Sequence, residues 1–233
     1  PVRFVGPKRV NSPGIAFDDL PMIDIVLISH NHYDHLDLAT LKRLCTLGHT
    51  PRMITPLGND TIIKQAVPNA WVETYDWHQH VSLGTEVTLH FEEAYHWSAR
   101  GLRDRLRALW AAFVLKTPAG LIYHVGDTGY HDGRIFKYVA DKHGPVRLAI
   151  LPIGAYEPRW FMAPMHLNPA EAVRCHQDTG ARPSLAMHWG TFPFGTDTFL
   201  GPIQRLQTNW NAHQFDGHKN LIIPKVGQRI MLR

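Results

Sequence analysis

The 233-residue chain has little of what marks several common protein classes. Its only cysteines are Cys45 and Cys175, so a disulfide framework is excluded and a reducing compartment is expected. The longest apolar run, residues 108–115, is far shorter than the roughly 20 residues of a membrane-spanning helix. Long basic runs are absent and the net charge is only +4, so no nucleic-acid module is indicated.

The composition is that of a folded domain. Hydrophobic residues make up 44% of the chain, and residues 1–22, rich in proline and glycine, predict an irregular lead-in. We expect strands at 25–28, 52–55, 71–75, 81–83, 86–91, 113–116, 121–125, 148–153, 184–187, 221–224 and 229–232. We expect helices at 38–47, from Asn59 or Asp60 to 67, at 135–142 and at 169–178. Several strands are joined by short turns, which favours an α/β sandwich over a doubly wound parallel sheet.

One stretch concentrates metal-ligand side chains. A short apolar segment, 25–28, predicts a buried strand, and it is followed within seven residues by His30, His32, Asp34 and His35. A turn at Tyr33–Asp34 would direct His35 to a second position near the first. Four ligands are too many for one catalytic zinc with an open position, so they suit two metals. The alternative is a histidine-rich surface loop.

Three later strands also end in a potential ligand: His96, Asp127 and His188. Active sites are often built from such strand-end positions on a rigid scaffold. Taken singly, each histidine is more typical of an ordinary buried or surface residue, and Asp127 before Thr128-Gly129 is typical of a turn. Together with the first cluster, they indicate one shared site.

These motifs resemble a known family. His30-x-His32-x-Asp34-His35 matches the signature of the metallo-β-lactamase superfamily, and His96, Asp127 and His188 match its remaining ligands in order. The similarity is greater still to its N-acylphosphatidylethanolamine-hydrolysing phospholipase D branch, at residues 28–37, 126–130, 152–162 and 188–192. The resemblance implies an αββα sandwich formed by residues 1–233 as one hydrolase domain. Family members carry further N-terminal strands, so we expect this domain to be incomplete at its N-terminus.

The resemblance also implies a ligand set for two Zn²⁺ ions. His30, His32 and His96 would hold the first ion, Asp34, His35 and His188 the second, and Asp127 would bridge them. A metal-bridging hydroxide would then attack phosphorus, which makes Asp127 a catalytic residue. Imidazole and carboxylate also suit iron or manganese, so the metal stays open.

Further residues are candidates for substrate contact. His166 matches a histidine beside the substrate phosphate in that family and could orient the phosphate or protonate the leaving alcohol; the alternative is a surface histidine. Arg159 could pair with phosphate or with a carboxylate such as Glu157. Trp97 and Tyr156 could contact the substrate, although aromatic residues more often belong to the core. Four arginines could meet anionic head groups or form a solvated face: Arg100, Arg103, Arg105 and Arg107.

The expected activity is hydrolysis of N-acylphosphatidylethanolamine to N-acylethanolamine and phosphatidic acid. The alternatives are a metal-dependent lactonase or another small-molecule phosphodiesterase on the same fold, a nuclease, and a non-catalytic zinc sensor. The expected partners are a phospholipid substrate, a membrane surface and a second copy of the chain in a homodimer, with no nucleic acid. The expected location is cytoplasmic, with peripheral contact at the inner membrane face.

Overall fold

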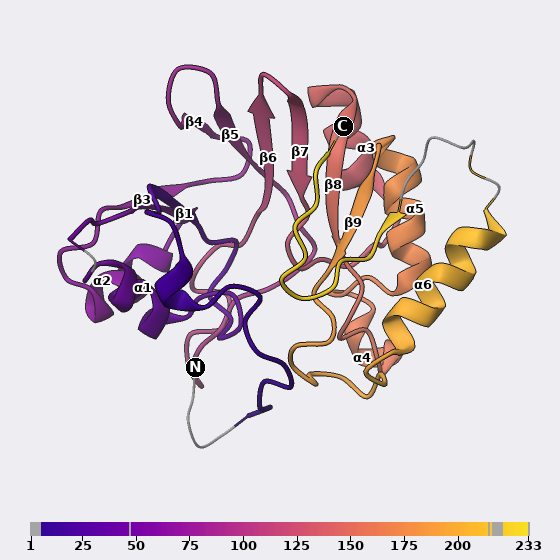
Figure 1. Ribbon diagram of the computed structural model, residues 1–233, viewed down its shortest axis with the longest axis horizontal. Helices are drawn as coiled ribbons and strands as arrows, with labels where there is room; N and C mark the ends of the chain where they lie inside the picture. Colours follow the sequence, from indigo (N-terminus) through magenta and orange to yellow (C-terminus); the bar gives the residue numbers. More distant parts are fainter. Residues whose placement is uncertain (1–5, 47, 214, 216–220, 233) are drawn as a thin grey trace.

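Two sheets of unequal size face each other in the computed structural model, which describes residues 6–46, 48–213, 215 and 221–232 (Figure 1). The small sheet is parallel, in the order β1 (Ile25–Leu27), β2 (Arg52–Pro56) and β3 (Val72–Tyr75). The large sheet has the order β10-β9-β8-β7-β6-β5-β4. Its strands are β4 (His80–Ser82), β5 (Thr88–Glu92), β6 (Ala112–Thr117), β7 (Gly120–His124), β8 (Val146–Pro152), β9 (Ser184–Met187) and β10 (Leu221–Ile222).

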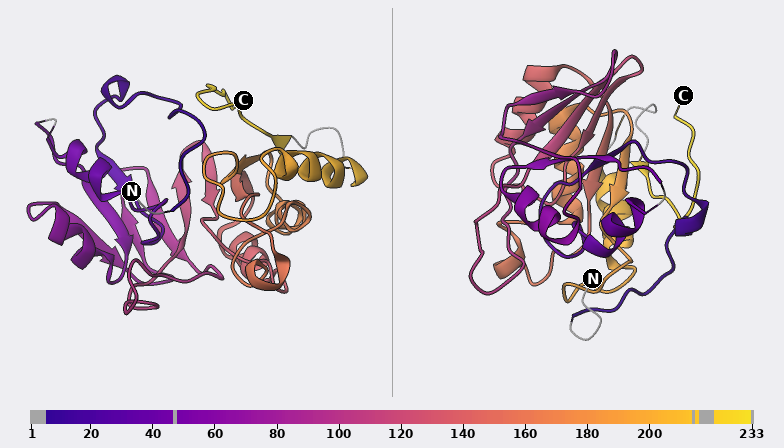
Figure 2. Two further views of the ribbon diagram at one scale, coloured as in Figure 1. Left: turned by 90° about the horizontal axis from the view of Figure 1, so that it is seen from below. Right: turned by 90° about the vertical axis from the view of Figure 1, so that its left-hand side faces the viewer.

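Helices cover the outer face of each sheet, which gives the four layers of an αββα sandwich (Figure 2, left). The small sheet is covered by α1 (Leu38–Leu44) and α2 (Asn59–Ala66). The large sheet is covered by α3 (Arg134–His143), α5 (Pro169–Thr179) and α6 (Gly201–Ala212), while the short α4 (Arg159–Met162) precedes α5. The predicted fold class is therefore confirmed.

Three apolar cores hold these layers together, and strand alternation explains them. On β5, Leu89 and Phe91 face the small sheet and pack with Phe113 of β6. Val114 of β6 faces the opposite way, into the core beneath α3 and α5. Strands β5 and β6 therefore contribute side chains to the core between the sheets and to the core beneath the helices.

Several local predictions are confirmed. Asp37 caps α1 by accepting a hydrogen bond from the backbone N–H of Ala39 at 3.2 Å. Asn168 forms a capping box with Glu171 at the start of α5. Both predicted hairpins, β4–β5 and β6–β7, are antiparallel pairs.

Other predictions are corrected. Helix α1 ends at Leu44, and residue 47, the predicted end, lies outside the described residues. The N-cap of α2 is Gly58, because the Asn59 side chain instead donates to the carbonyl oxygens of Pro56 and Leu109. Residues 229–232 are irregular and form no strand. The sequence reading missed α6, since its buried residues are only Pro202 and Leu206 and its apolar periodicity is weak.

Candidate metal centre

The loop after β1 carries the first four potential ligands. The backbone N–H of Ile28 still bonds to Ile54, and the chain then leaves the sheet and forms a helical turn. In that turn the N–H groups of His35 and Leu36 both donate to the carbonyl oxygen of His32, at 3.1 and 2.8 Å. The turn predicted at Tyr33–Asp34 is thus present, and it directs the side chains of His32 and His35 to different sides of one site.

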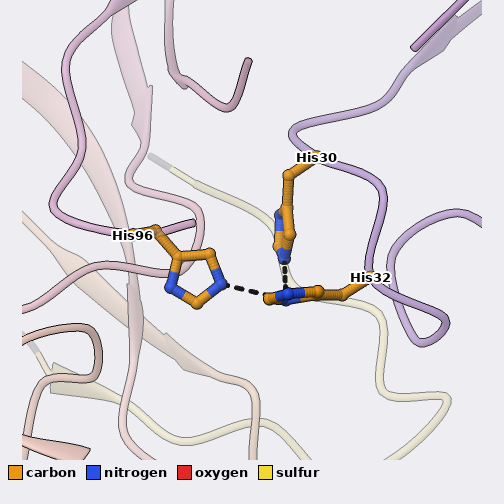
Figure 3. Close-up of side chains that lie close together, drawn as sticks. All are labelled: His30, His32 and His96. Carbon is orange, nitrogen blue, oxygen red and sulfur yellow. Dashed lines mark hydrogen bonds between the residues drawn. The ribbon is translucent and has the colours of Figure 1, made fainter. Parts of the chain in front are cut away.

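Three imidazoles converge in the first group of potential ligands (Figure 3). His32 Nδ1 lies 3.0 Å from His30 Nε2 and 3.1 Å from His96 Nε2. A tetrahedral zinc with bonds of about 2.0–2.1 Å places its ligand atoms about 3.3–3.4 Å apart. Both distances to His32 Nδ1 are therefore close to the separation that one shared ion requires.

Asp127 connects this group to a second one, formed with Asp34, His35 and His188. Asp127 Oδ2 lies 3.1 Å from His35 Nε2 and 3.3 Å from His188 Nε2. The same oxygen is 3.8 Å from His96 Nε2 and 3.9 Å from His30 Nε2. Asp34 Oδ2 lies 3.1 Å from His35 Nε2, so the second group is equally compact. A single carboxylate thus reaches both groups, as a bridging ligand would.

The donor set fits metal ions better than it fits direct pairing among its own members. Buried polar atoms of three of these residues have no hydrogen-bond partner among the described residues: His32 Nε2, Asp127 Oδ1 and His188 Nδ1. Buried polar atoms normally find partners, so these side chains form a polar site that they do not satisfy among themselves. Neutral imidazoles and carboxylates are donors that zinc accepts. We conclude that these seven residues could hold metal ions.

Neighbouring groups orient the ligands. The Nδ1 atom of His96 lies 3.0 Å from the carbonyl oxygen of Met165, to which it donates, leaving Nε2 free to bind a metal. The hydroxyl of Ser29 lies 3.0 Å from His30 Nδ1. The backbone N–H of Tyr95 donates to Thr128 Oγ1 at 2.8 Å, which joins the loops that carry His96 and Asp127.

Arg100 holds the first ligand loop in place. Its Nη1 donates to the carbonyl oxygens of Asn31 at 2.9 Å and Leu36 at 2.8 Å, on either side of the turn. Its guanidinium also lies 4.1 Å from the ring centre of Tyr33. Of the two roles open for Arg100 in the sequence, head-group contact and a solvated face, the structure shows neither, because the side chain is directed into the protein.

His188 has an unusual backbone conformation, with φ of +56°. Left-handed backbone is unfavourable for residues other than glycine, so the surrounding packing must hold it. Gly154 allows this packing, since a side chain there would collide with the His188 carbonyl oxygen. The pairing of β8 with β9 brings these two loops together.

Burial and charge set the protonation of the metal-free site. Burial lowers the pKa of His96 to about 3 and of His124 to about 4. Burial alone would lower the pKa of His35, but the carboxylates of Asp127 and Asp34 outweigh it and raise the pKa to about 9. Burial would raise the pKa of Asp127, yet the imidazoles of His188 and His35 hold it well below its usual range. In the absence of metal, protons on His35 and His188 therefore balance the carboxylates.

Two cavities meet at the centre and share Asp34, Ala155, His188 and Phe194 in their walls. One, of about 290 Å³, has a largely apolar wall and reaches Asp127 and His166. Its apolar and aromatic residues include Trp97, Phe161, Met162 and Met165. The other, of about 230 Å³, is more polar and includes Arg9, Thr191 and Asp197. The site is thus accessible from an apolar side and from a polar side.

The remaining candidate residues divide into two pairs. His166 and Trp97 line the apolar cavity, and His166 Nδ1 is buried without a hydrogen-bond partner among the described residues. Arg159 instead pairs with Glu171 at 2.9 Å and donates to the His166 carbonyl oxygen at 3.0 Å. Tyr156 is 1% exposed and lines neither cavity. We therefore assign Arg159 and Tyr156 to support of the wall rather than to substrate contact.

The sequence reading missed several residues of the cavity walls: Arg9, Met162, Phe194 and Asp197. Arg9 comes from the lead-in, whose Val10 N–H donates to the Thr191 carbonyl oxygen at 2.9 Å. No local pattern indicates that residues so far apart in the chain share a wall. The only available signal was that residues 152–162 and 188–192 are specific to one branch of the family.

Comparison with known proteins agrees with this geometry. The family described as Beta-lactamase superfamily domain matches residues 2–189. The chain is 38% identical over 219 residues to N-acyl-phosphatidylethanolamine-hydrolyzing phospholipase D 1 of Caenorhabditis elegans, covering 91% of this chain and 61% of the relative. It is 34% identical to the mitochondrial N-acyl-phosphatidylethanolamine-hydrolyzing phospholipase D of Saccharomyces cerevisiae, covering 88% of this chain and 44% of the relative.

Solved structures share the fold. An isothiocyanate hydrolase from Delia radicum gut bacteria superimposes with a TM-score of 0.70 at 17% identity, covering 92% of this chain and 78% of that one. The metallo hydrolase Igni18 from Ignicoccus hospitalis gives a TM-score of 0.67 at 18% identity, covering 92% and 82%.

The chain therefore belongs to the beta-lactamase superfamily. Its clustered histidines and aspartates could hold metal ions. It spans 61% and 44% of the lengths of the two phospholipase D relatives.

Proposed function

We propose that the chain is a dinuclear zinc phosphodiesterase that hydrolyses N-acylphosphatidylethanolamine to N-acylethanolamine and phosphatidic acid. The observation that carries the proposal is a complete seven-residue ligand set that opens into an apolar cavity. The identity of 38% to a relative named for this activity supports the same substrate.

In this proposal the chain holds two zinc ions through the two groups described above, with Asp127 between them. When bound, the ions would acidify water to give a nucleophile at neutral pH and would neutralise charge on the phosphate. Burial lowers the pKa of His166 to about 4, so its imidazole is neutral at pH 7 and can donate one N–H to a phosphate oxygen. We assign His166 to orienting the phosphate.

The two cavities suggest how a phosphodiester would lie. The apolar wall formed by Trp97, Phe161 and Met162 suits hydrocarbon next to the phosphate. Arg9, in the polar cavity, places a positive charge on the other side of the same centre. The cavities are too small for whole acyl chains, so most of each chain would remain in the lipid layer.

Exposed aromatic residues support contact with a membrane surface. Phe161 and Phe194 line the apolar cavity and are 48% and 40% exposed, and Trp160 beside them is 84% exposed. Aromatic side chains favour the membrane interface. Within the described residues, no helix has the length and apolar character needed to cross a bilayer.

The cellular setting remains part of the proposal. Cys45 and Cys175 are both free, which agrees with a reducing compartment. We propose a cytoplasmic location with peripheral contact at the inner membrane face, residues 1–233 as one hydrolase domain, and association of two copies as a homodimer.

The direct test is a substrate panel with zinc-loaded and metal-free protein, using mass spectrometry to detect products. We expect ethanolamide release from N-acylphosphatidylethanolamine in mixed micelles, dependent on zinc. Turnover of lactones without any phosphodiester hydrolysis would replace the proposed activity with that of a lactonase. Turnover of soluble phosphodiesters alone would keep the chemistry and reject the lipid substrate.

A further inference from the structure

A second group of ligand-type side chains lies outside the metal centre, between β5 and the end of α3. His90 and Glu92 project from the same face of β5, because strand residues two apart share a face, and His143 is the last residue of α3. One ligand-type atom from each of these three residues lies within 4.8 Å of the other two. We refer to His90, Glu92 and His143 as the outer cluster.

The two imidazoles of the outer cluster have the arrangement seen in the metal centre. The ring centres of His90 and His143 are 4.8 Å apart, edge to face at 63°. Those of His32 and His96 are 4.9 Å apart at 83°. The spacing of the two outer imidazoles is thus similar to that of a pair in the metal centre.

Two side chains of the outer cluster, Glu92 and His143, are buried, and one of them is incompletely hydrogen-bonded. The side chains of Glu92 and His143 are each 1% exposed, with His143 Nε2 2.6 Å from Glu92 Oε1. His143 Nδ1 has no hydrogen-bond partner among the described residues, which is unfavourable for a buried polar atom. Burial and the neighbouring His143 lower the pKa of His90 to about 4, so its imidazole offers a lone pair at neutral pH.

Lys142 and His78 both contact the carboxylate of Glu92. Lys142 Nζ lies 2.9 Å from Glu92 Oε1, and His78 Nδ1 lies 3.1 Å from Glu92 Oε2. Glu92 also lines a cavity of about 390 Å³ together with His78, Glu93 and Arg134. The Lys142 side chain is 29% exposed and flexible, so it can move into solvent when another cation approaches through this cavity.

We propose that His90, Glu92 and His143 form a separate zinc-binding site that is distinct from the metal centre. Two imidazoles and one carboxylate are a zinc donor set, and water or His78 would complete the tetrahedron. The ion would join the edge hairpin to the end of α3. It would also fix Glu92, four residues before His96, and thereby stabilise the start of the loop that carries this ligand.

The test is zinc content after equilibrium dialysis at defined free Zn²⁺, with the full chain and no substrate. We expect His143→Gln and Glu92→Gln each to bind one ion fewer than wild type. His80→Gln is the matched control, since His80 stacks on His90 at 5.2 Å without belonging to the cluster, and it should bind as many ions as wild type. The difference of one ion does not depend on how many the metal centre holds or on its substrate.

A further variant, Lys142→Met, keeps all three ligands and removes the competing ammonium. We expect it to tighten the outer site by at least about tenfold, because a like charge beside a cation site is unfavourable. Equal zinc content in wild type and His143→Gln would overturn the proposal, as would loss of an ion in His80→Gln. If both ligand variants fail to fold, unchanged zinc affinity in Lys142→Met overturns it.

Discussion

The metal centre and the outer cluster use the same kinds of side chain but balance their carboxylates differently. In the metal centre, Asp34 and Asp127 form ion pairs only with histidines among the described residues. In the outer cluster, Glu92 has a lysine at 2.9 Å. A lysine keeps its charge at any physiological pH, whereas paired histidines do so only while they hold protons.

This difference defines two kinds of site. The metal centre needs either protons or metal ions to balance its buried carboxylates, so it is unfavourable when empty at high pH. In the outer cluster, Lys142 already balances the charge of Glu92, so an ion there would compete with Lys142. The closeness of the ligand side chains does not distinguish the two sites. What distinguishes them is whether a permanently charged residue, such as Lys142, lies next to the carboxylate.

The largest effect is expected from Asp127→Asn, which removes the carboxylate shared by both groups of ligands. We expect turnover to fall by at least about 1,000-fold, since the loss of metal-based charge stabilisation amounts to several kcal/mol. Zinc content should fall in parallel when measured by elemental analysis. Asp141→Asn, an exposed carboxylate at the end of α3, is the control. Full turnover in Asp127→Asn would contradict a need for this carboxylate, and with it the distinction drawn between the metal centre and the outer cluster.

Arg100→Ala tests whether the loop that carries the first four ligands needs the hydrogen bonds from Arg100. Loss of the bonds to Asn31 and Leu36 should reduce activity about 10–100-fold, as is typical for groups that orient metal ligands. Added zinc should restore part of the activity, because the ligands remain present. Arg103→Ala, an exposed neighbour, should behave as wild type in the same titration. Equal activity of both variants would show that the turn at residues 32–36 keeps its conformation without the Arg100 side chain.

The stability of metal-free protein should depend on pH in two directions. The pKa of His35 is raised to about 9, so its stabilising protonation is complete below about 6.5 and is lost as pH rises through 9. The pKa of His124 is lowered to about 4, so stability also falls as pH decreases from about 6.5 to 4. Calorimetry with chelator should therefore give a maximum melting temperature near pH 6.5.

Zinc-loaded protein should lose the alkaline decrease, because bound metal requires neutral imidazoles and binds more tightly as pH rises. A decrease of the same size between pH 6.5 and 9 in both forms would show that His35 does not control it.

The smallest effect is expected from a substitution of the exposed Trp160, which tests contact with a membrane surface. Trp160→Ser should weaken binding to anionic vesicles by roughly fivefold, corresponding to about 1 kcal/mol of interfacial burial, and leave hydrolysis of a soluble diester unchanged. Trp71→Ser is the control, since Trp71 lies just before β3, is 57% exposed and lines neither cavity at the metal centre. Equal vesicle binding by both variants would contradict membrane contact through Trp160.

Local patterns in the sequence predicted the first ligand cluster and the strand ends that bear the other ligands. They also predicted both hairpins and the capping box at Asn168, because these depend on neighbouring residues. The left-handed φ of His188 and the inward direction of Arg100 depend on packing between distant segments, so no local pattern indicates them. The outer cluster joins Glu92 to a residue 51 positions away, and only the packing of α3 on the large sheet brings them together.

The separation of the ligands along the chain has a consequence for how the protein matures. Asp34 and His188 lie 154 residues apart, and they meet only when β1 and β9 are both in place. During synthesis the first imidazoles leave the ribosome long before the last one, so a nascent chain offers an incomplete and weaker set of donors. Metal loading would therefore come late, and tight retention of ions would distinguish finished molecules from unfinished ones.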